Sequence, residues 1–162
     1  MLTASLNLFA QSRTLSNKEI VECKTPESVA WNFVMSIVNE DYSKMEELTS
    51  PHYLSELYSW SLDSGLSFSE MFTEENIHDI SGMRPLLTAQ PQKYFLAITW
   101  TQTTTLENEY SNGKSYSNLE GYSVSFNCFD SNGNIYSGND HDTSARVVLV
   151  YLDNVWRVAY FK

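Results

Sequence analysis

Basic residues are scarce in this sequence. Its 162 residues include 10 Lys and Arg against 20 Asp and Glu, which gives a formal net charge of −10. Nucleic acids and anionic membrane surfaces are bound mainly through clusters of Lys and Arg. The composition therefore argues against nucleic acid and against an anionic membrane as a partner.

Cysteine is nearly absent, since the chain contains only Cys23 and Cys128. Two cysteines so far apart in the sequence form neither a metal-binding motif nor a disulfide scaffold. Cys128 falls on the apolar side of a predicted strand, which favours a buried thiol, and a disulfide would require an exported protein. We expect two free thiols.

Long apolar runs are also lacking, because no stretch approaches the ~18 apolar residues that a membrane span needs. The start, MLTASLNLFAQS, has a short apolar run followed by small residues, which is typical of the end of a secretory signal, but it lacks a basic segment. Residues 1–24 are therefore either a signal-peptide remnant or an ordinary mobile N-terminus. The first interpretation places the protein outside the cytoplasm, for instance in a bacterial periplasm, and the second leaves it cytoplasmic. The pattern slightly favours export.

Sequence motifs for common chemistries are missing. The chain has no nucleophile elbow, phosphate-binding loop, dinucleotide-binding glycine pattern or His-Glu-x-x-His. Two polar segments partly resemble metal-binding loops. They are Asp140, His141 and Asp142 within residues 138–144, and residues 130–134. Three successive residues rarely converge on one ion, and the second segment lacks the acidic residue that closes a calcium loop. We interpret both as turns and predict no metal and no cofactor.

The remaining composition is that of a folded domain. Apolar residues make up 42% of the chain and aromatic residues 14%, which is enough for a hydrophobic core. We predict one domain over residues 25–162, with helices in its first part. Thr25-Pro26 and Ser50-Pro51 each combine a capping side chain with a proline suited to the first helical turn.

Further signals delimit these helices. Asp41 is placed to open a short helix that ends near Leu48, and Gly65 is placed to end the next one. Ser67 and Glu70 have the spacing of a capping box. We therefore predict three or four short helices over residues 26–76, and we interpret residues 85–91, which are bracketed by prolines, as a connector.

From residue 93 onward the apolar residues alternate, as they do in half-buried strands. The segments KYFLAITW (93–100) and YSVSFNCF (122–129) have this pattern, and Asn112-Gly113 is a good turn between them. Strict pairing through that turn places Trp100 opposite Ser125, on the wrong face of the sheet. A β-bulge must then intervene, and Gly121 is our candidate for it.

The last segment, ARVVLVYLDNVWRVAYFK (145–162), predicts a β-hairpin. Asp153 and Asn154 tolerate positive φ and suit a two-residue turn. On one face this register pairs Tyr151 with Trp156, Leu149 with Val158 and Val147 with Tyr160; on the other it pairs Val150 with Arg157 and Arg146 with Phe161. All six residues on the first face are apolar or aromatic, so that face is predicted to point inward.

Two segments carry a resemblance to a known family. TPESVAWNFVMSIVNEDYSKMEELTSP (25–51) resembles the opening helices, and VVLVYLDNVWRVAYF (147–161) the closing hairpin, of the nuclear transport factor 2-like superfamily, which has a cystatin-like fold. The resemblance implies an α+β fold in which N-terminal helices pack in the concave face of a curved, cone-shaped antiparallel sheet. It also implies a pocket between helices and sheet, and often a homodimer through the sheet.

The family includes ketosteroid isomerase, scytalone dehydratase, polyketide cyclases and many exported bacterial domains of unknown function, so the fold leaves the function open. Its enzymes place acidic, basic or tyrosine side chains in the pocket. The inner sheet face that we infer carries Tyr94, Leu96, Ile98, Trp100, Tyr122, Val124, Phe126, Cys128, Val147, Leu149, Tyr151, Trp156, Val158 and Tyr160. None of these is a carboxylate, His, Lys or Arg, and a tyrosine with a pKa of about 10 is a poor base without a partner.

The helices offer an alternative catalytic group. His52 lies in the first turn of a predicted helix, and His78 and Asp79 are adjacent after the last one. A His–Asp pair over the pocket would suit a dehydratase, isomerase or cyclase. Adjacent side chains point apart, however, and His52 is placed at a surface, so we predict no catalytic residue.

Aromatic density is the main positive signal for a binding site. Large aromatic side chains are predicted to line a cavity for a flat or apolar small molecule, namely Trp60, Trp100, Tyr122, Tyr151 and Trp156. The alternative is that these rings fill the cavity as core.

Residues 45–83 lack Lys and Arg and contain Glu46, Glu47, Glu74 and Glu75, which form either a solvated helical surface or a docking face for a cationic protein. We therefore favour a non-catalytic ligand- or protein-binding module over a small enzyme.

Overall fold

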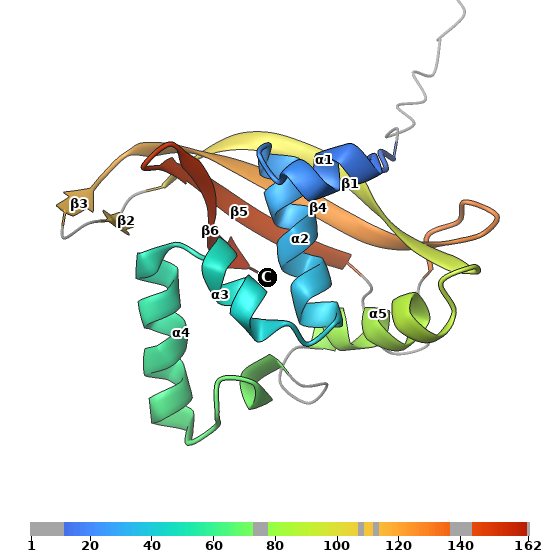
Figure 1. Cartoon of the computed structure of the whole chain (residues 1–162), viewed down its shortest axis with the longest axis horizontal. Coiled ribbons are helices and arrows are strands. Elements are labelled where there is room, and N and C mark those ends of the chain that lie inside the picture. Colours follow the sequence, from blue (N-terminus) through green and yellow to red (C-terminus); the bar gives the residue numbers. More distant parts are fainter. Residues whose placement is uncertain (1–11, 73–77, 107–108, 112–113, 137–143, 162) are drawn as a thin grey trace, which may run out of the picture.

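The α+β class is confirmed by a computed structural model, which describes residues 12–72, 78–106, 109–111, 114–136 and 144–161 (Figure 1). The helices are α1 (Asn17–Glu22), α2 (Pro26–Val38), α3 (Tyr42–Leu48), α4 (Pro51–Ser64), the 3-10 turn η1 (Glu70–Phe72) and α5 (His78–Ala89). The strands are β1 (Tyr94–Leu106), β2 (Glu109–Ser111), β3 (Lys114–Tyr116), β4 (Leu119–Asp130), β5 (Ser144–Leu152) and β6 (Val155–Phe161). Four strands form an open antiparallel sheet in the order β1-β4-β5-β6, and β2 and β3 form a separate hairpin.

Local capping chemistry starts and ends the helices at the predicted residues. Thr25 and Ser28 form a reciprocal capping box at the start of α2. The side chains of Asp41 and Ser50 accept hydrogen bonds from backbone N–H groups at the starts of α3 and α4. Gly65 ends α4 with a φ of 70°, a left-handed conformation that glycine adopts at little cost.

Two features of the helical part differ from the prediction. The connector predicted over residues 85–91 is wrong, because Pro85 lies inside α5. Met83 and Leu86 of this helix are buried in the core, and this packing offsets the cost of a proline within a helix. We interpreted residues 1–24 as a signal-peptide remnant or a mobile N-terminus and assigned no helix there, yet α1 is present, and its start is a capping box between Ser16 and Glu19. The Ser-x-x-Glu spacing was the signal that would have revealed it.

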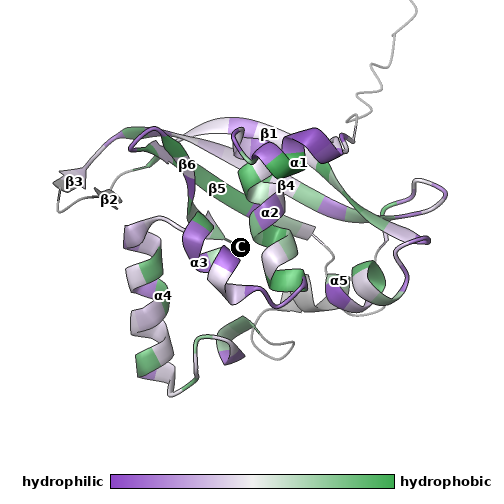
Figure 2. Ribbon diagram, viewed as in Figure 1, coloured by the Kyte–Doolittle hydropathy of each residue, from purple (hydrophilic) through white to green (hydrophobic). Residues whose placement is uncertain are grey.

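The core lies between α2 and one face of the sheet. Phe33, Val34 and Ile37 of α2 are fully buried and belong to the same cluster as Phe126 of β4 and Leu149 of β5. Figures 1 and 2 show α2 crossing the sheet, with hydrophobic residues concentrated in α2 and β5. The opposite, outer face of the sheet carries a second, smaller apolar cluster of Val150, Leu152 and Ala159.

The terminal hairpin confirms the predicted turn and the register next to it. Asp153 and Asn154 have φ values of 50° and 66°. Tyr151 pairs with Trp156, Leu149 with Val158 and Val150 with Arg157. Farther from the turn the predicted register is wrong, because Val147 pairs with Phe161 and Val148 with Tyr160. The extra residue, Ala159, lets both Val158 and Phe161 enter the core.

A second bulge occurs where β1 pairs with β4, but not at the predicted residue. The register shifts between Ile98 and Trp100, whereas Gly121 pairs regularly with Thr104. Ile98 is buried, and Trp100 lies opposite Ser125 on the outer face, 45% exposed. The two bulges thus turn Trp100 and Tyr160, which we predicted on the inner face, to the outer face.

Gly121 is required for a close approach between strands rather than for a bulge. A Cβ atom added there would lie 2.9 Å from the Leu149 carbonyl oxygen and 3.0 Å from a methyl carbon of Leu106. We expect Gly121→Ala to lower the free energy of unfolding by about 1–3 kcal/mol, because the sheet must shift to admit the methyl group. Urea denaturation measures this, with the exposed Ser117→Ala as control. An unchanged unfolding midpoint in Gly121→Ala would show that the strands are not so close.

No helix in the described ranges combines the length and the apolar character needed to cross a membrane.

Candidate functional site

Three of the five predicted aromatic side chains lie together on the inner face of the sheet. The ring centres of Tyr122 and Trp156 are 6.3 Å apart, and those of Trp156 and Tyr151 are 5.2 Å apart. Tyr151 is half exposed and Trp156 is partly buried. We call Tyr122, Tyr151 and Trp156 the aromatic trio. The hairpin register produces it, because that register places Tyr151 directly opposite Trp156.

The other two rings lie elsewhere. Trp60 is 45% exposed on α4, where Tyr53 and Leu57 are the buried residues. Trp100, on the outer face of the sheet, has the guanidinium carbon of Arg146 5.7 Å from its ring centre. The five aromatic residues therefore do not line one cavity.

A groove of about 540 Å³ lies beside the aromatic trio, and we call it the hairpin groove. The residues that line it come from the end of α1, from the α1–α2 turn, from α2, from α3 and from the terminal hairpin: Val21, Glu22, Cys23, Lys24, Val29, Lys44, Glu47, Leu48, Tyr151, Asn154, Val155, Trp156 and Arg157. A shallower hollow lined by Lys24, Leu119, Glu120, Tyr151 and Trp156 shares three residues with it. The volume of the hairpin groove is in the range of small-molecule sites, about 300–1,000 Å³.

The local fold explains why Lys24 lies at this groove. Cys23 ends α1 in a left-handed conformation with a φ of 49°, and Thr25 caps α2 two residues later. Lys24 is therefore an exposed residue of a tight turn between two helices. Val29 and Leu48 are buried and form an apolar part of the groove lining, and burial raises the pKa of the neighbouring Cys23 thiol.

The hairpin groove carries slightly more positive than negative side chains, although the chain as a whole is acidic. The groove contains Lys24, Lys44 and Arg157 together with Glu22 and Glu47. The Lys44 ammonium lies 3.0 Å from Glu47, and the Glu22 carboxylate lies 3.8 Å from Lys18. Within the described part of the chain, Lys24 and Arg157 form no ion pair. The groove therefore presents two cations that no nearby carboxylate neutralises by direct contact.

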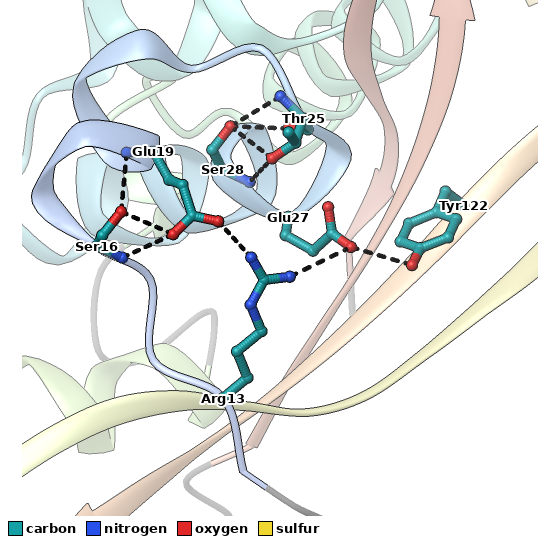
Figure 3. A network of polar contacts seen from close by, with 7 residues as sticks. All are labelled: Arg13, Ser16, Glu19, Thr25, Glu27, Ser28 and Tyr122. Carbon is teal, nitrogen blue, oxygen red and sulfur yellow. Dashed lines mark hydrogen bonds and ion pairs between the residues drawn. The ribbon is translucent and has the colours of Figure 1, made fainter.

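A polar network adjoins the aromatic trio (Figure 3). The Tyr122 hydroxyl donates a hydrogen bond of 3.1 Å to Glu27, and the Arg13 guanidinium lies 3.9 Å from the same carboxylate oxygen. Arg13 also pairs with Glu19, whose pKa is lowered chiefly by hydrogen bonds from Ser16. The Glu27 side chain is only 15% exposed.

Glu27 was not among the predicted site residues, because we considered acids only on the sheet and next to the histidines. The available signal was the position of Glu27 in the first turn of the helix that packs on the sheet. Lys24 and Arg157 were missed because the groove depends on α1, which we did not predict.

Of the predicted alternative catalytic residues, only His52 has a described side chain, and it does not join this site. His52 lies at the start of α4 with its Nε2 3.4 Å from Glu56, and it does not line the hairpin groove. His78 and Asp79 begin α5, and their side chains lie outside the described part of the structure. The described residues contain no group of three or more His, Cys, Asp and Glu that could hold a metal ion.

The predicted acidic docking face is described only in part. Glu46 accepts a hydrogen bond of 2.8 Å from the Tyr58 hydroxyl, which raises the pKa of that tyrosine, while Glu47 pairs with Lys44. Glu74 and Glu75 lie outside the described residues. Glu46 and Glu47 also line a second groove of about 470 Å³, which includes Arg157.

One of the two polar segments that we interpreted as turns lies within the described residues. Asp130 accepts hydrogen bonds from the backbone N–H groups of Asn132 and Asn134, which lower its pKa, so residues 130–134 form a turn as predicted. The segment 138–144, apart from Ser144, lies outside the described residues.

Both cysteines are free thiols, and burial raises the pKa of Cys128 to about 11.

No known protein family, curated protein sequence or solved structure shows significant similarity to this chain.

Proposed function

We propose that this protein is a non-catalytic binding module that takes a small molecule in the hairpin groove. The observation that carries the proposal is the half-exposed ring of Tyr151 beside Trp156, at the edge of a groove that also contains Lys24 and Arg157. An aromatic surface next to a few polar groups is typical of small-molecule sites. The two cations provide polar groups that are free to bind a ligand.

We also propose that the fold is the cone-shaped fold of the nuclear transport factor 2-like superfamily. Supporting this, the helices precede the sheet in the chain, α2 packs on the inner face, and the sheet ends in a hairpin with Trp156 on that face. The long strands β1 and β4 bend over α2 (Figure 1). In that fold the hairpin groove would lie at the open side of the cone, and a homodimer would form through the outer face of the sheet.

Native mass spectrometry of the protein purified from its own host tests the binding function. We expect a mass above that of the 18.6 kDa chain, with the excess released on denaturation. We expect the excess mass to be lost in Tyr151→Ala and kept in Tyr160→Ala, a control of similar exposure on the outer face. A bare wild-type chain, or a bound molecule that Tyr151→Ala retains, would contradict the proposal.

The contact between Glu27 and Tyr122 favours a second candidate function, a small dehydratase, isomerase or cyclase. A carboxylate and a phenol in hydrogen-bond contact are a pair through which a proton can be exchanged with a substrate. Glu27→Gln keeps an oxygen that accepts the Tyr122 hydrogen bond but removes the base. An enzyme would then retain a molecule of different mass in the variant, since turnover stops, whereas a binding module would retain the same molecule.

A further inference from the structure

We propose that the hairpin groove binds planar aromatic carboxylates, with the ring against Tyr151 and Trp156 and the carboxylate at Lys24, assisted by Arg157. This inference rests on the proposed function, because it assigns a ligand class to the same groove.

The aromatic half of the ligand is inferred from Tyr151 and Trp156. Their planes meet at 54° with the ring centres 5.2 Å apart, and Tyr151 is 50% exposed. Rings of this kind contact other aromatic rings in offset or edge-to-face geometry. An aromatic ring in the groove would cover the exposed face of Tyr151 and extend the contact that Trp156 already makes with Tyr122.

The anionic half is inferred from the charges that face the groove. Lys44 is neutralised by Glu47, and Glu22 is paired with Lys18. Lys24 and Arg157 are then the groove cations that have no ion-pair partner among the described residues. Arg157 pairs with Val150 on the face opposite to Tyr151 and Trp156, and it also lines the second groove with Glu46 and Glu47. Lys24 is therefore the principal contact, although Glu120 shares its shallower hollow.

The net charge of −10 repels an anion at long range, but this repulsion is screened beyond about 10 Å at 0.1 M salt. Contacts inside the groove therefore decide which ligands bind. A carboxylate suits the groove better than a phosphate, because phosphate sites use free backbone N–H groups at a helix start. At the start of α2 the Ser28 N–H already binds the Thr25 side chain.

The outer face also brings a cation and an aromatic ring together, but there the cation already has partners. Arg146 lies over the Trp100 ring and donates a hydrogen bond of 2.9 Å to the Ser123 hydroxyl. The hairpin groove is thus the better site for an aromatic anion.

A ¹H–¹⁵N NMR titration of the full chain tests the inference with three probes. These are 2-naphthoate, its neutral counterpart 2-naphthamide, and cyclohexanecarboxylate, which keeps the charge without the flat ring. The indole N–H signals of Trp31, Trp60, Trp100 and Trp156 report where each probe binds. We expect 2-naphthoate to shift the Trp156 signal with saturation, and to bind about tenfold more tightly than either other probe, which corresponds to ~1.4 kcal/mol.

Charge variants isolate the carboxylate contact. We expect Lys24→Gln to weaken 2-naphthoate binding about 3- to 10-fold and to leave 2-naphthamide unchanged, because one charge-assisted contact is lost. Lys93→Gln is the matched control, since it makes the same charge change at an exposed residue just before β1. Equal weakening by both variants would show a general charge effect and would overturn the carboxylate contact.

The other outcomes separate this inference from the proposed function. Equal affinity for 2-naphthoate and 2-naphthamide at Trp156 overturns the anionic ligand class but leaves the binding module intact. A shift centred on Trp100 or Trp60 overturns the site. No saturable shift with any probe up to the millimolar range overturns the aromatic carboxylate class, while a bound molecule in the mass spectrum would still uphold the proposed function.

Discussion

Replacing Phe33 with alanine is expected to lower the free energy of unfolding by about 3–5 kcal/mol. Phe33 is fully buried on the face of α2 that packs on the sheet, and its ring centre lies 5.5 Å from that of Phe161 on the last strand. The substitution removes the ring and leaves a cavity between the first long helix and the closing strand, so both the transfer and the cavity terms contribute. Urea denaturation followed by circular dichroism measures the loss.

Two further variants make this prediction specific. Leu62→Ala removes a large apolar side chain that is 83% exposed on α4, and we expect a change of no more than about 0.5 kcal/mol. Phe33→Leu, which keeps most of the volume, serves if the alanine variant does not fold, and we expect it to lie between the two. A loss below about 1 kcal/mol in Phe33→Ala would contradict the packing of α2 on the sheet.

Replacing Arg84 with methionine is expected to cost about 2–3 kcal/mol of stability. From α5 the Arg84 guanidinium donates hydrogen bonds of 2.9 Å and 3.2 Å to the carbonyl oxygens of Ile37 and Val38, and it pairs with Glu40 at 2.9 Å. The last carbonyl groups of a helix lack partners within the helix. At the end of α2, Arg84 supplies a donor to the Val38 carbonyl and adds a second donor to the Ile37 carbonyl, which also accepts from the Glu40 N–H. Methionine keeps the apolar stem of the side chain while removing all of its donors.

Lys44→Met is the matched control for Arg84→Met. It breaks the Lys44–Glu47 pair, which is solvent-exposed and joins residues of one helix. Such pairs contribute at most about 1 kcal/mol. Equal effects of the two substitutions in the same denaturation experiment would mean that Arg84 acts as an ordinary surface cation rather than as a cap for α2.

The parts of the fold that could be predicted depend on chemistry local in sequence. Caps such as Thr25, Asp41 and Ser50 satisfy backbone groups only a few residues away, so their effect can be recognised without the rest of the chain. The same holds for the turn at Asp153 and Asn154, which sets the adjacent register.

The bulges could not be predicted because they depend on contacts with residues that are distant in the sequence. The Thr99 hydroxyl, at the β1 bulge, donates a hydrogen bond of 2.9 Å to the Asn127 side chain. Next to it, the backbone of Arg13 exchanges hydrogen bonds of 2.8 Å and 2.9 Å with that of Ile98. Neither partner is near β1 in sequence, and a shift of one residue exchanges the faces of a strand.

In the candidate site, too, the predictable part is the one that depends on local contacts. Tyr151 and Trp156 come together through a local turn, and Tyr122 joins them because β4 pairs with β5 in a regular register. Trp100 is turned away by a bulge that depends on distant contacts. The cations of the groove depend on where α1 and its turn place Lys24 against the hairpin, which no local pattern reveals.

The most direct test of the hairpin groove as the binding site is the set of intermolecular nuclear Overhauser effects in the complex with 2-naphthoate. We predict effects between the naphthyl protons and the rings of Tyr151 and Trp156, and none to Trp60. Effects to Trp100 with none to Trp156 would contradict the proposed site and place the ligand on the outer face of the sheet.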